Sequence, residues 1–494
     1  MSTKGFGSAM RSGVFWSTAA FVAGRLLSLV AMVILARILV PAEFGILAAI
    51  VVYVGLIELV SDLGMRAAVV YEQDTAKGEL LDSAFTINLV LAILLSALGV
   101  ALAPVVADLF QVPAAADLFR LAAINPLIVA MGNIHDAVLL RDLQFRRRAI
   151  PQIIRAFVRG ALSIALAVAG FGAAALVIGL LAGSLAWSIS LWIVSTYGPR
   201  LKLAVRGVGR MISYGLGAAA LELLAVATTR VDVVVIGAII GPAALGLYTV
   251  AYRIPELILE SVAWNVSAVA FPALSRERVA SEHTGVGDGT IALLRYQALF
   301  ALPVAAALAL LAPALMVVVF SPRWAAAGGV AAAVAILFGI SACLFPLGDA
   351  FKALGRQRIL VAINVAFLPV LAGSIIAAAP LGIEAVAWVR VASQALFGAV
   401  VLIAAAKVLS VRTLRIGSAL LPGALAAAVV GGGVELTRIL VPGDGMVALM
   451  AGALVAVACF AGAVRLVMPD LARRAGSVLR TRRRPLRVAL GGPL

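Results

Sequence analysis

The residues best suited to chemistry are arginines that fall inside or beside long apolar stretches. The stretch LELLAVATTRVDVVVIGAII, residues 221–240, is long enough to cross a bilayer and yet contains Arg230. A charge at the centre of a bilayer costs roughly 2.5–3.5 kcal/mol on insertion scales, so such residues are expected to face protein or water. Arginine keeps its charge, and its planar guanidinium group matches phosphate oxygens. We therefore predict that six arginines bind an anionic, phosphate-bearing ligand: Arg25, Arg155, Arg159, Arg230, Arg253 and Arg390.

Acidic residues in comparable places leave an alternative open. Arg253 is followed three residues later by Glu256, and Arg230 is preceded by Glu222 two helical turns earlier. Each arginine could therefore pair with an interior carboxylate and have a purely structural role. Both interpretations hold together if a ligand displaces the internal partner.

Three further charges are spaced by four residues. Glu58, Asp62 and Arg66 would lie on one stripe of a continuous helix. This spacing predicts either a structural ladder of ion pairs or a functional group. Arg66 also lies near the end of its apolar stretch, where a long side chain can reach the membrane surface.

Long helices must position these side chains, because the composition is that of a polytopic membrane protein. The chain has 494 residues, of which 64% are hydrophobic and 13% charged, whereas soluble domains have about 45–50% apolar and about 25% charged residues. A membrane-spanning helix needs about 20 apolar residues. Windows of that size predict an all-α protein with about fourteen spans, near residues 13–36, 42–66, 83–107, 115–139, 149–169, 172–196, 210–238, 242–270, 291–320, 325–350, 358–379, 381–406, 416–438 and 445–468.

The connections between these spans alternate in charge. One set is rich in Lys and Arg, as in RDLQFRRR (141–148) and the tail RTRRRPLR (480–487), whereas the other set contains segments such as QVPAAAD. Basic loops of multi-pass proteins remain in the cytoplasm. We therefore predict a multi-pass protein of the cytoplasmic (inner) membrane with both termini inside. The net charge of +16 follows this topology and does not indicate nucleic-acid binding.

A motif recurs in the two halves of the chain. PAEFG (41–45) follows the first predicted span, and PAALG (242–246) follows the seventh. Internal repeats are typical of transporters that bind their substrate between two halves. The spacing predicts two pseudo-symmetric six-helix bundles forming a V, with two additional helices. The expected parts are an N-lobe (1–198), a basic linker (199–210), a C-lobe (211–408), two C-terminal helices (409–470) and a basic cytoplasmic tail (471–494).

Other motifs point away from cofactors. Cys343 and Cys459 both lie in apolar runs, which predicts neither a disulfide framework nor a zinc site. No Walker-type phosphate-binding motif occurs, and GVGDG (285–289) lacks a following lysine, so we interpret it as a flexible connector. We expect no metal, no cofactor and no catalytic residue.

Two segments resemble a known family. LARILVPAEFGILAAIVVYVGLIELVSDLGMRAAVV (35–70) is similar to the opening of polysaccharide-transport flippases of the MOP superfamily, in particular Wzx-type lipopolysaccharide and exopolysaccharide translocases. RVDVVVIGAIIGPAALGLYTVAYRIPELI (230–258), closed by VAFPALSR (269–276), resembles the second-half signature of the same branch. Within it, Arg230, Asp232 and Arg253 match the motif.

The resemblance implies a flippase that moves undecaprenyl-pyrophosphate-linked oligosaccharide units by alternating access, and not an enzyme. Its partners would be membrane lipids, a polysaccharide polymerase and a chain-length regulator. Direction would come from an H⁺ or Na⁺ gradient or from consumption of the product. Five carboxylates are our candidates for ion coupling: Asp62, Glu222, Asp232, Glu256 and Glu260.

Three other classes compete with this interpretation. A MATE-like drug or cation antiporter would share the architecture but should have a cavity rich in carboxylates and aromatic residues. A membrane-embedded glycan polymerase or glycosyltransferase should have a long outer loop, and every outer loop here is short. A scaffold that recruits partners through the basic tail (473–487) is the third, although such tails usually contact anionic lipid.

Overall fold

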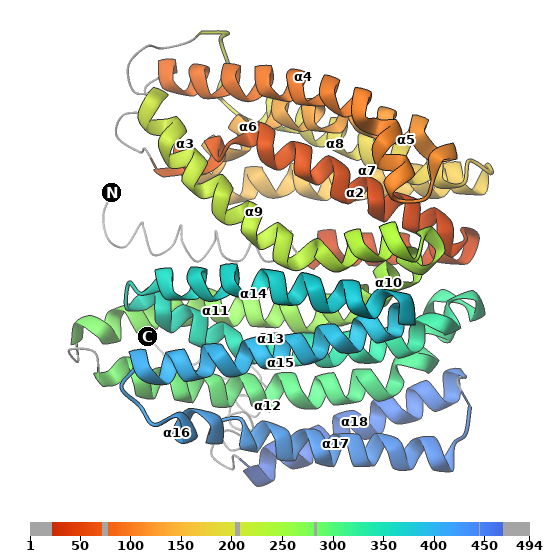
Figure 1. Ribbon diagram of the computed structural model, residues 1–494, viewed down its shortest axis with the longest axis vertical. Coiled ribbons are helices and arrows are strands. Elements are labelled where there is room, and N and C mark those ends of the chain that lie inside the picture. Colours follow the sequence, from red (N-terminus) through yellow and green to blue (C-terminus); the bar gives the residue numbers. More distant parts are fainter. Residues whose placement is uncertain (1–21, 72–77, 203–207, 281–283, 444, 468–494) are drawn as a thin grey trace, which may run out of the picture. The chain divides into compact units, whose positions relative to one another are not determined.

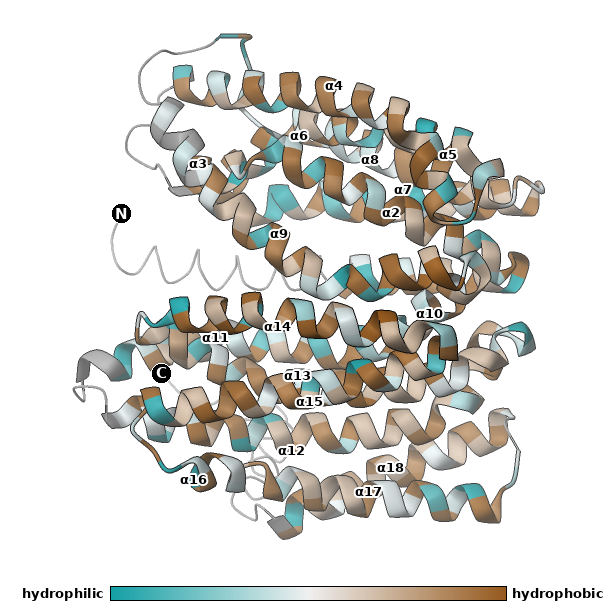
Figure 2. Cartoon of the chain, in the orientation of Figure 1, coloured by the Kyte–Doolittle hydropathy of each residue, from teal (hydrophilic) through white to brown (hydrophobic). Residues whose placement is uncertain are grey.

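The protein is an all-helical membrane protein, as predicted. The structure is a computed structural model that describes residues 22–71, 78–202, 208–280, 284–443 and 445–467, and this part of the chain contains no strand. Thirteen of its helical segments are long and apolar enough to cross a membrane, and they match the second to fourteenth predicted spans. The first predicted span begins outside the described residues, but residues 22–38, which include its C-terminal part, are helical. Apolar residues predominate along the long helices (Figure 2).

The chain divides into two compact units. The first comprises Met1–Arg253, Val319–Ala327 and Asn364–Val389, and the second comprises the remaining segments. Helices α14 (Gln357–Ala378) and α15 (Ile383–Val408) therefore contribute residues to both. These units follow packing, whereas the predicted lobes follow the repeated motif, so the lobe boundaries remain a proposal.

In the first unit, α7 packs along α8, and α6 packs against α4 and α8 (Figure 1). The helices of this unit, after the segment 22–38, are α2 (Pro41–Asp62), α3 (Met65–Tyr71), α4 (Gly78–Leu109), η1 (Pro113–Ala115), α5 (Ala116–Ala122), α6 (Asn125–Arg141), α7 (Phe145–Val168), α8 (Ala173–Val194), α9 (Val208–Ile239), α10 (Pro242–Pro255), η4 (Pro322–Ala327) and η5 (Ala379–Leu381).

A sharp break separates α2 from α3. Leu63 and Gly64 both adopt left-handed backbone conformations, with φ of 43° and 65°, which ends α2. Arg66 therefore lies on a different helix from Glu58 and Asp62, and the predicted single stripe of these three residues is wrong. The apolar residues around the break hide it from a hydropathy window.

The two copies of the repeated motif lie against each other in the first unit. Pro41 opens α2 and Pro242 opens α10, as suits a residue that needs no amide donor at a helix start. A Cβ atom on Gly45 would overlap the carbonyl oxygen of Pro242, and one on Gly246 would overlap that of Pro41. The contact is reciprocal, as expected of two copies of one motif, and it requires glycine on both sides.

The start of the predicted linker is fixed to the first unit. Tyr197 donates a hydrogen bond to Asp82 Oδ1 at 2.9 Å, and the backbone N–H of Arg200 donates to the same oxygen at 3.0 Å. Burial, followed by the hydrogen bond to Asp82, raises the pKa of the Tyr197 phenol above its ordinary value. Residues 203–207 of the linker and the tail 471–494 lie outside the described residues.

In the second unit, α12, α13 and α15 contribute to a large apolar core, which includes Ala301, Leu347 and Val401. GVGDG (285–289) lies within α12, so its prediction as a flexible connector is wrong. Asp288 pairs with Arg415 Nη2 at 3.0 Å. The remaining elements are η2 (Glu256–Glu260), α11 (Ser261–Ala280), α12 (Thr284–Leu315), η3 (Met316–Phe320), α13 (Gly328–Ala353), α16 (Thr413–Ser418), α17 (Leu421–Leu440) and α18 (Met446–Val467).

Candidate functional site

One face of α7 carries three arginines. Arg148, Arg155 and Arg159 are separated by seven and four residues, so they follow one another along the same side of the helix. Glycines of α8 allow close packing of α7: a Cβ on Gly183 would lie 2.8 Å from Arg159 Cβ. The small residues of α8 therefore bring the arginine-bearing backbone close and fix its position.

Arg155 is held by two side chains of α8. Its Nη2 donates a hydrogen bond to Ser184 Oγ at 3.1 Å. Its guanidinium carbon lies 5.3 Å from the ring centroid of Trp187, which is a cation–π distance. Arg155 also interacts with the charge of Glu58 on α2, and Asn125 Nδ2 donates to Glu58 Oε1 at 2.5 Å. Arg155 is thus partly neutralised and held in place.

Arg159 has a different environment. The charges of Arg253 and Arg155 both act on it, and the structure shows no hydrogen bond or ion pair of Arg159 within the described residues. The guanidinium groups of Arg155 and Arg253 therefore both lie within electrostatic range of that of Arg159. Their mutual repulsion falls when an anion binds between them. This set, which we call the arginine cluster, unites three of the six predicted ligand-binding residues.

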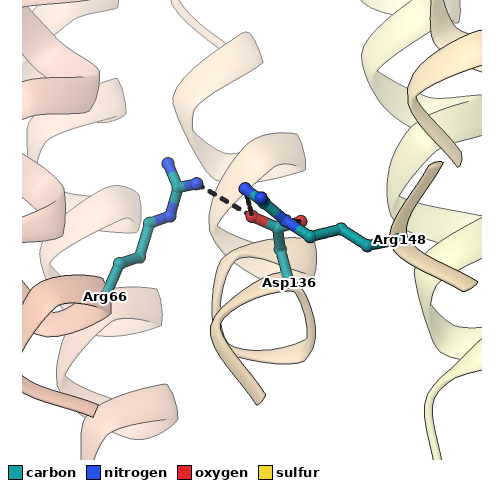
Figure 3. Close-up of polar contacts among 3 residues, drawn as sticks. All are labelled: Arg66, Asp136 and Arg148. Carbon is teal, nitrogen blue, oxygen red and sulfur yellow. Dashed lines mark hydrogen bonds and ion pairs between the residues drawn. The ribbon is translucent and has the colours of Figure 1, made fainter. Parts of the chain in front are cut away.

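A second set of charges joins α3, α6 and α7 (Figure 3). Asp136 is 2% exposed and accepts hydrogen bonds from Arg148 Nε at 2.7 Å and Arg148 Nη2 at 3.0 Å. It also accepts a bond from Arg66 Nη2 at 2.9 Å. The structural alternative, in which arginines pair with interior carboxylates, therefore holds for Arg66 and Arg148.

Two of the predicted coupling carboxylates meet in the first unit. Asp62, at the end of α2, interacts with the charges of Arg66 and of Glu222 on α9. Its Oδ1 atom is buried and has no hydrogen-bond partner in the described residues. A like-charged pair of carboxyl groups with a single nearby arginine can hold a proton or a small cation.

Asp232 is surrounded by hydrogen-bond donors. Its Oδ2 accepts from the hydroxyl groups of Tyr248 at 2.8 Å and Tyr252 at 2.9 Å, and its Oδ1 accepts from the backbone of Val233 at 2.9 Å. The side chain is 1% exposed. This arrangement ties α9 to α10 and leaves few lone pairs for a coupling ion.

The other predicted residues lie elsewhere. Arg25 is half-buried on the first helix, and Arg230 is exposed on α9. Arg390 belongs to the second unit, where its Nε atom is buried and the residue interacts with neighbouring groups. Glu256 and Glu260 are the first and last residues of the π-helical segment η2 in that unit.

The sequence did not identify Asp136 as a site residue, and it did not identify Arg148 as a residue that could bind a ligand. Arg148 was visible only as part of the basic run RDLQFRRR, which indicates topology. The signal that could have found it is its position seven residues before Arg155 on the same helix. In the part of the chain that the structure describes, no group of three or more His, Cys, Asp or Glu side chains could hold a metal ion.

Comparisons with other sequences point to polysaccharide biosynthesis. Residues 34–328, more than half of the chain, match a family described as polysaccharide biosynthesis protein. The succinoglycan biosynthesis transport protein ExoT of Rhizobium meliloti (strain 1021) is 29% identical over 320 residues, covering 64% of this chain and 63% of that protein. The teichuronic acid biosynthesis protein TuaB of Bacillus subtilis (strain 168) is 25% identical over 304 residues, covering 60% and 62%. The chain thus spans less than two thirds of the length of each of these relatives.

Comparisons with solved structures identify the fold. The lipid II flippase MurJ, in an inward closed conformation, superimposes with a TM-score of 0.75 at 14% identity, covering 92% of this chain and 99% of MurJ. An inward-facing multidrug resistance MATE family transporter of the MOP superfamily gives a TM-score of 0.63 at 16% identity, covering 78% and 94%. The chain therefore belongs to the polysaccharide biosynthesis protein family and has the fold of the MOP superfamily.

Proposed function

We propose that the protein is a flippase that moves undecaprenyl-pyrophosphate-linked oligosaccharide units across the cytoplasmic membrane for lipopolysaccharide or exopolysaccharide biosynthesis. The observation that carries this proposal is Arg159, which has no partner within the described residues and lies near Arg155 and Arg253. A diphosphate group supplies several anionic oxygens that planar guanidinium groups bind in pairs. One relative is a succinoglycan biosynthesis transport protein and the other a teichuronic acid biosynthesis protein, and the similar fold of MurJ belongs to a lipid II flippase.

The remaining parts of the proposal follow from the sequence and from the family. Alternating access between lobes 1–198 and 211–408 would carry the headgroup across. The basic connections would place both termini in the cytoplasm. The pair Asp62 and Glu222 is our candidate for coupling to H⁺ or Na⁺, since both carboxylates lie in the same unit as the arginine cluster.

The rival functions fit the site less well. A cation antiporter of the same superfamily would place its drug against three guanidinium groups, which repel a cation. A glycan polymerase or glycosyltransferase would form new glycosidic bonds, so it would lengthen the glycan rather than relocate it. A transport assay with a defined substrate separates these alternatives.

The test uses the purified full chain in proteoliposomes that contain an undecaprenyl-diphosphate disaccharide with a dithionite-sensitive fluorescent label. Wild type should increase the fraction of label that dithionite bleaches per unit time, with no change in glycan length. Arg159→Gln should slow this movement at least roughly tenfold, because one charge-assisted contact to phosphate is lost. Arg120→Gln is the matched control, since Arg120 is 47% exposed and pairs with Asp117. A wild-type rate for Arg159→Gln at equal protein level would refute the proposal.

A further inference from the structure

Asp136 holds two arginines that come from different helices. Arg148 on α7 binds the carboxylate with two nitrogen atoms, while Arg66 on α3 binds it with one (Figure 3). Asp136 itself is buried, but the Arg66 side chain is 43% exposed and that of Arg148 is 22% exposed. The buried carboxylate therefore lies between two arginine side chains that are partly exposed (Figure 3).

This set of three residues retains positive charge. Two guanidinium groups face one carboxylate, which leaves a net charge of +1. Within the described residues, the guanidinium group of Arg66 donates a hydrogen bond only to Asp136, through Nη2, while its charge also interacts with Asp62 and Glu58. Its Nε and Nη1 groups remain able to donate hydrogen bonds to an anion. A phosphate group is the anion whose several oxygens suit two arginine forks at once.

One member of this set, Arg148, lies on the same helix as two residues of the arginine cluster. Arg148 precedes Arg155 by seven residues on one face of α7, which is about 10 Å along the helix axis. The charges of Arg66 and Asp136 both act on Arg155. A phosphate group bound at Arg66 and Arg148 would therefore have a neighbouring cationic site further along the same helix face.

We propose that Arg66 and Arg148, positioned by Asp136, form a second phosphate-binding site, reached before the arginine cluster by a lipid-linked diphosphate coming from the predicted cytoplasmic side. This inference rests on the proposed function. Asp136 has two effects: it fixes the directions of both guanidinium groups, and its negative charge keeps binding weak enough for the phosphate to move on. Asp136 is a positioning residue, and Arg66 and Arg148 are the binding residues.

The two effects of Asp136 give a distinctive expectation. Asp136→Asn keeps the size of the side chain but raises the net charge of the set from +1 to +2. Phosphate should then bind roughly tenfold more tightly at this site, while transport becomes slower because release is slower. A purely structural role for Asp136 predicts the opposite, since disordered arginines would bind phosphate less well.

The first experiment is a calorimetric titration of the detergent-purified full chain with inorganic pyrophosphate. Wild type should bind two equivalents. Arg66→Gln should bind one, and it should fold normally because the Asp136–Arg148 pair remains. Arg159→Gln should also bind one, by loss of the other site, and Arg120→Gln should bind two.

The outcomes separate this inference from the proposed function. If wild type binds only one pyrophosphate, and if Arg159→Gln removes this binding while Arg66→Gln does not, the second site is wrong. The proposed function would then still stand. If Arg66→Gln binds one pyrophosphate fewer than wild type and Arg159→Gln does not, the result would support the second site and count against the arginine cluster. Weaker pyrophosphate binding by folded Asp136→Asn would overturn the role assigned to Asp136.

A competition measurement distinguishes the two lipid sources of phosphate. Undecaprenyl pyrophosphate should displace pyrophosphate from the site that Arg66→Gln removes, and phosphatidylglycerol at the same concentration should not. Equal displacement by phosphatidylglycerol would make this a general lipid-headgroup site and overturn its place on the substrate path. Undecaprenol, which lacks phosphate, is the control for the lipid tail.

Discussion

The two units each bury an aspartate at a matching place. Asp136 lies near the end of α6 and Asp349 near the end of α13, and both are 2% exposed. Each is followed by a turn with a left-handed residue, Leu143 or Gly355. Eight residues after each aspartate comes a glutamine at the start of the next helix. The two halves thus share a buried carboxylate at a helix-to-helix turn.

The partners of these aspartates differ. Asp136 binds two arginines, whereas Asp349 accepts a hydrogen bond from Ser267 at 2.5 Å and has Lys352 Nζ at 3.5 Å. Among the described residues, two arginines therefore contact the aspartate of the first unit, whereas one lysine contacts that of the second. The positive charge around Asp136 therefore comes from particular side chains of the first unit and is not a consequence of the turn that both units share.

Removing the two carboxylates should have the largest and most unequal effects. Asp136→Ala leaves two guanidinium groups facing each other, and we expect it to lower the free energy of unfolding by about 3 kcal/mol. Asp349→Ala leaves one serine hydroxyl without an acceptor and should cost about 1–2 kcal/mol. Thermal unfolding of both purified variants in the same detergent checks the ranking. Equal losses of stability would remove the distinction between the units.

Exchanging arginine and lysine in the basic partners of the two aspartates should change stability less than removing the carboxylates does. Arg148→Lys replaces a two-pronged contact with a single point charge and should cost about 1.5 kcal/mol. Lys352 is 55% exposed, so Lys352→Arg should change stability by less than about 0.5 kcal/mol. Melting temperatures measured over a range of KCl concentrations test both. If Lys352→Arg shifts the melting temperature as much as Arg148→Lys does, the two-pronged contact between Arg148 and Asp136 does not explain the difference in stability.

Hydropathy allowed the spans to be predicted, but it could not locate breaks inside apolar sequence. The boundary between α2 and α3 depends on left-handed conformations at both Leu63 and Gly64. Leucine rarely adopts this conformation, and a single glycine inside a helical pattern is weak evidence for a helix end. The error at GVGDG is the reverse: three glycines suggest a loop, but the segment is helical because tertiary contacts override weak local preference. In that helix Gly287 packs near Val411, and Asp288 pairs with Arg415.

The candidate site could be predicted only in part for a similar reason. The cost of burying charge identifies Arg155, Arg159 and Arg253 as unusual from sequence alone. It does not tell which charges meet, because pairing depends on how separate helices pack. Thus Arg159 and Arg253, 94 positions apart in the numbering, lie within electrostatic range, and the partner of Arg66 proved to be Asp136 on another helix.

The smallest expected effects concern buried polar groups without net charge, of which each unit has an example. In the described residues, both ring nitrogens of His135 in the first unit lack a hydrogen-bond partner, as does Gln297 Nε2 in the second. The His135 ring packs among Phe85, Trp192 and Tyr197, with centroid distances of 6.5, 4.8 and 5.4 Å. These contacts need an aromatic ring and make no use of the nitrogen atoms.

His135→Phe keeps the ring and removes two unpartnered polar atoms, so it should leave stability unchanged or raise it by up to about 1 kcal/mol. Gln297→Met, which keeps the length of the side chain, should behave in the same way. Transport of the labelled lipid-linked disaccharide should stay at the wild-type rate in both. If His135→Phe instead stops transport while its melting temperature is retained, then a neutral side chain next to Asp136 takes part in the function. The difference between the units would then not be one of arginine charge alone.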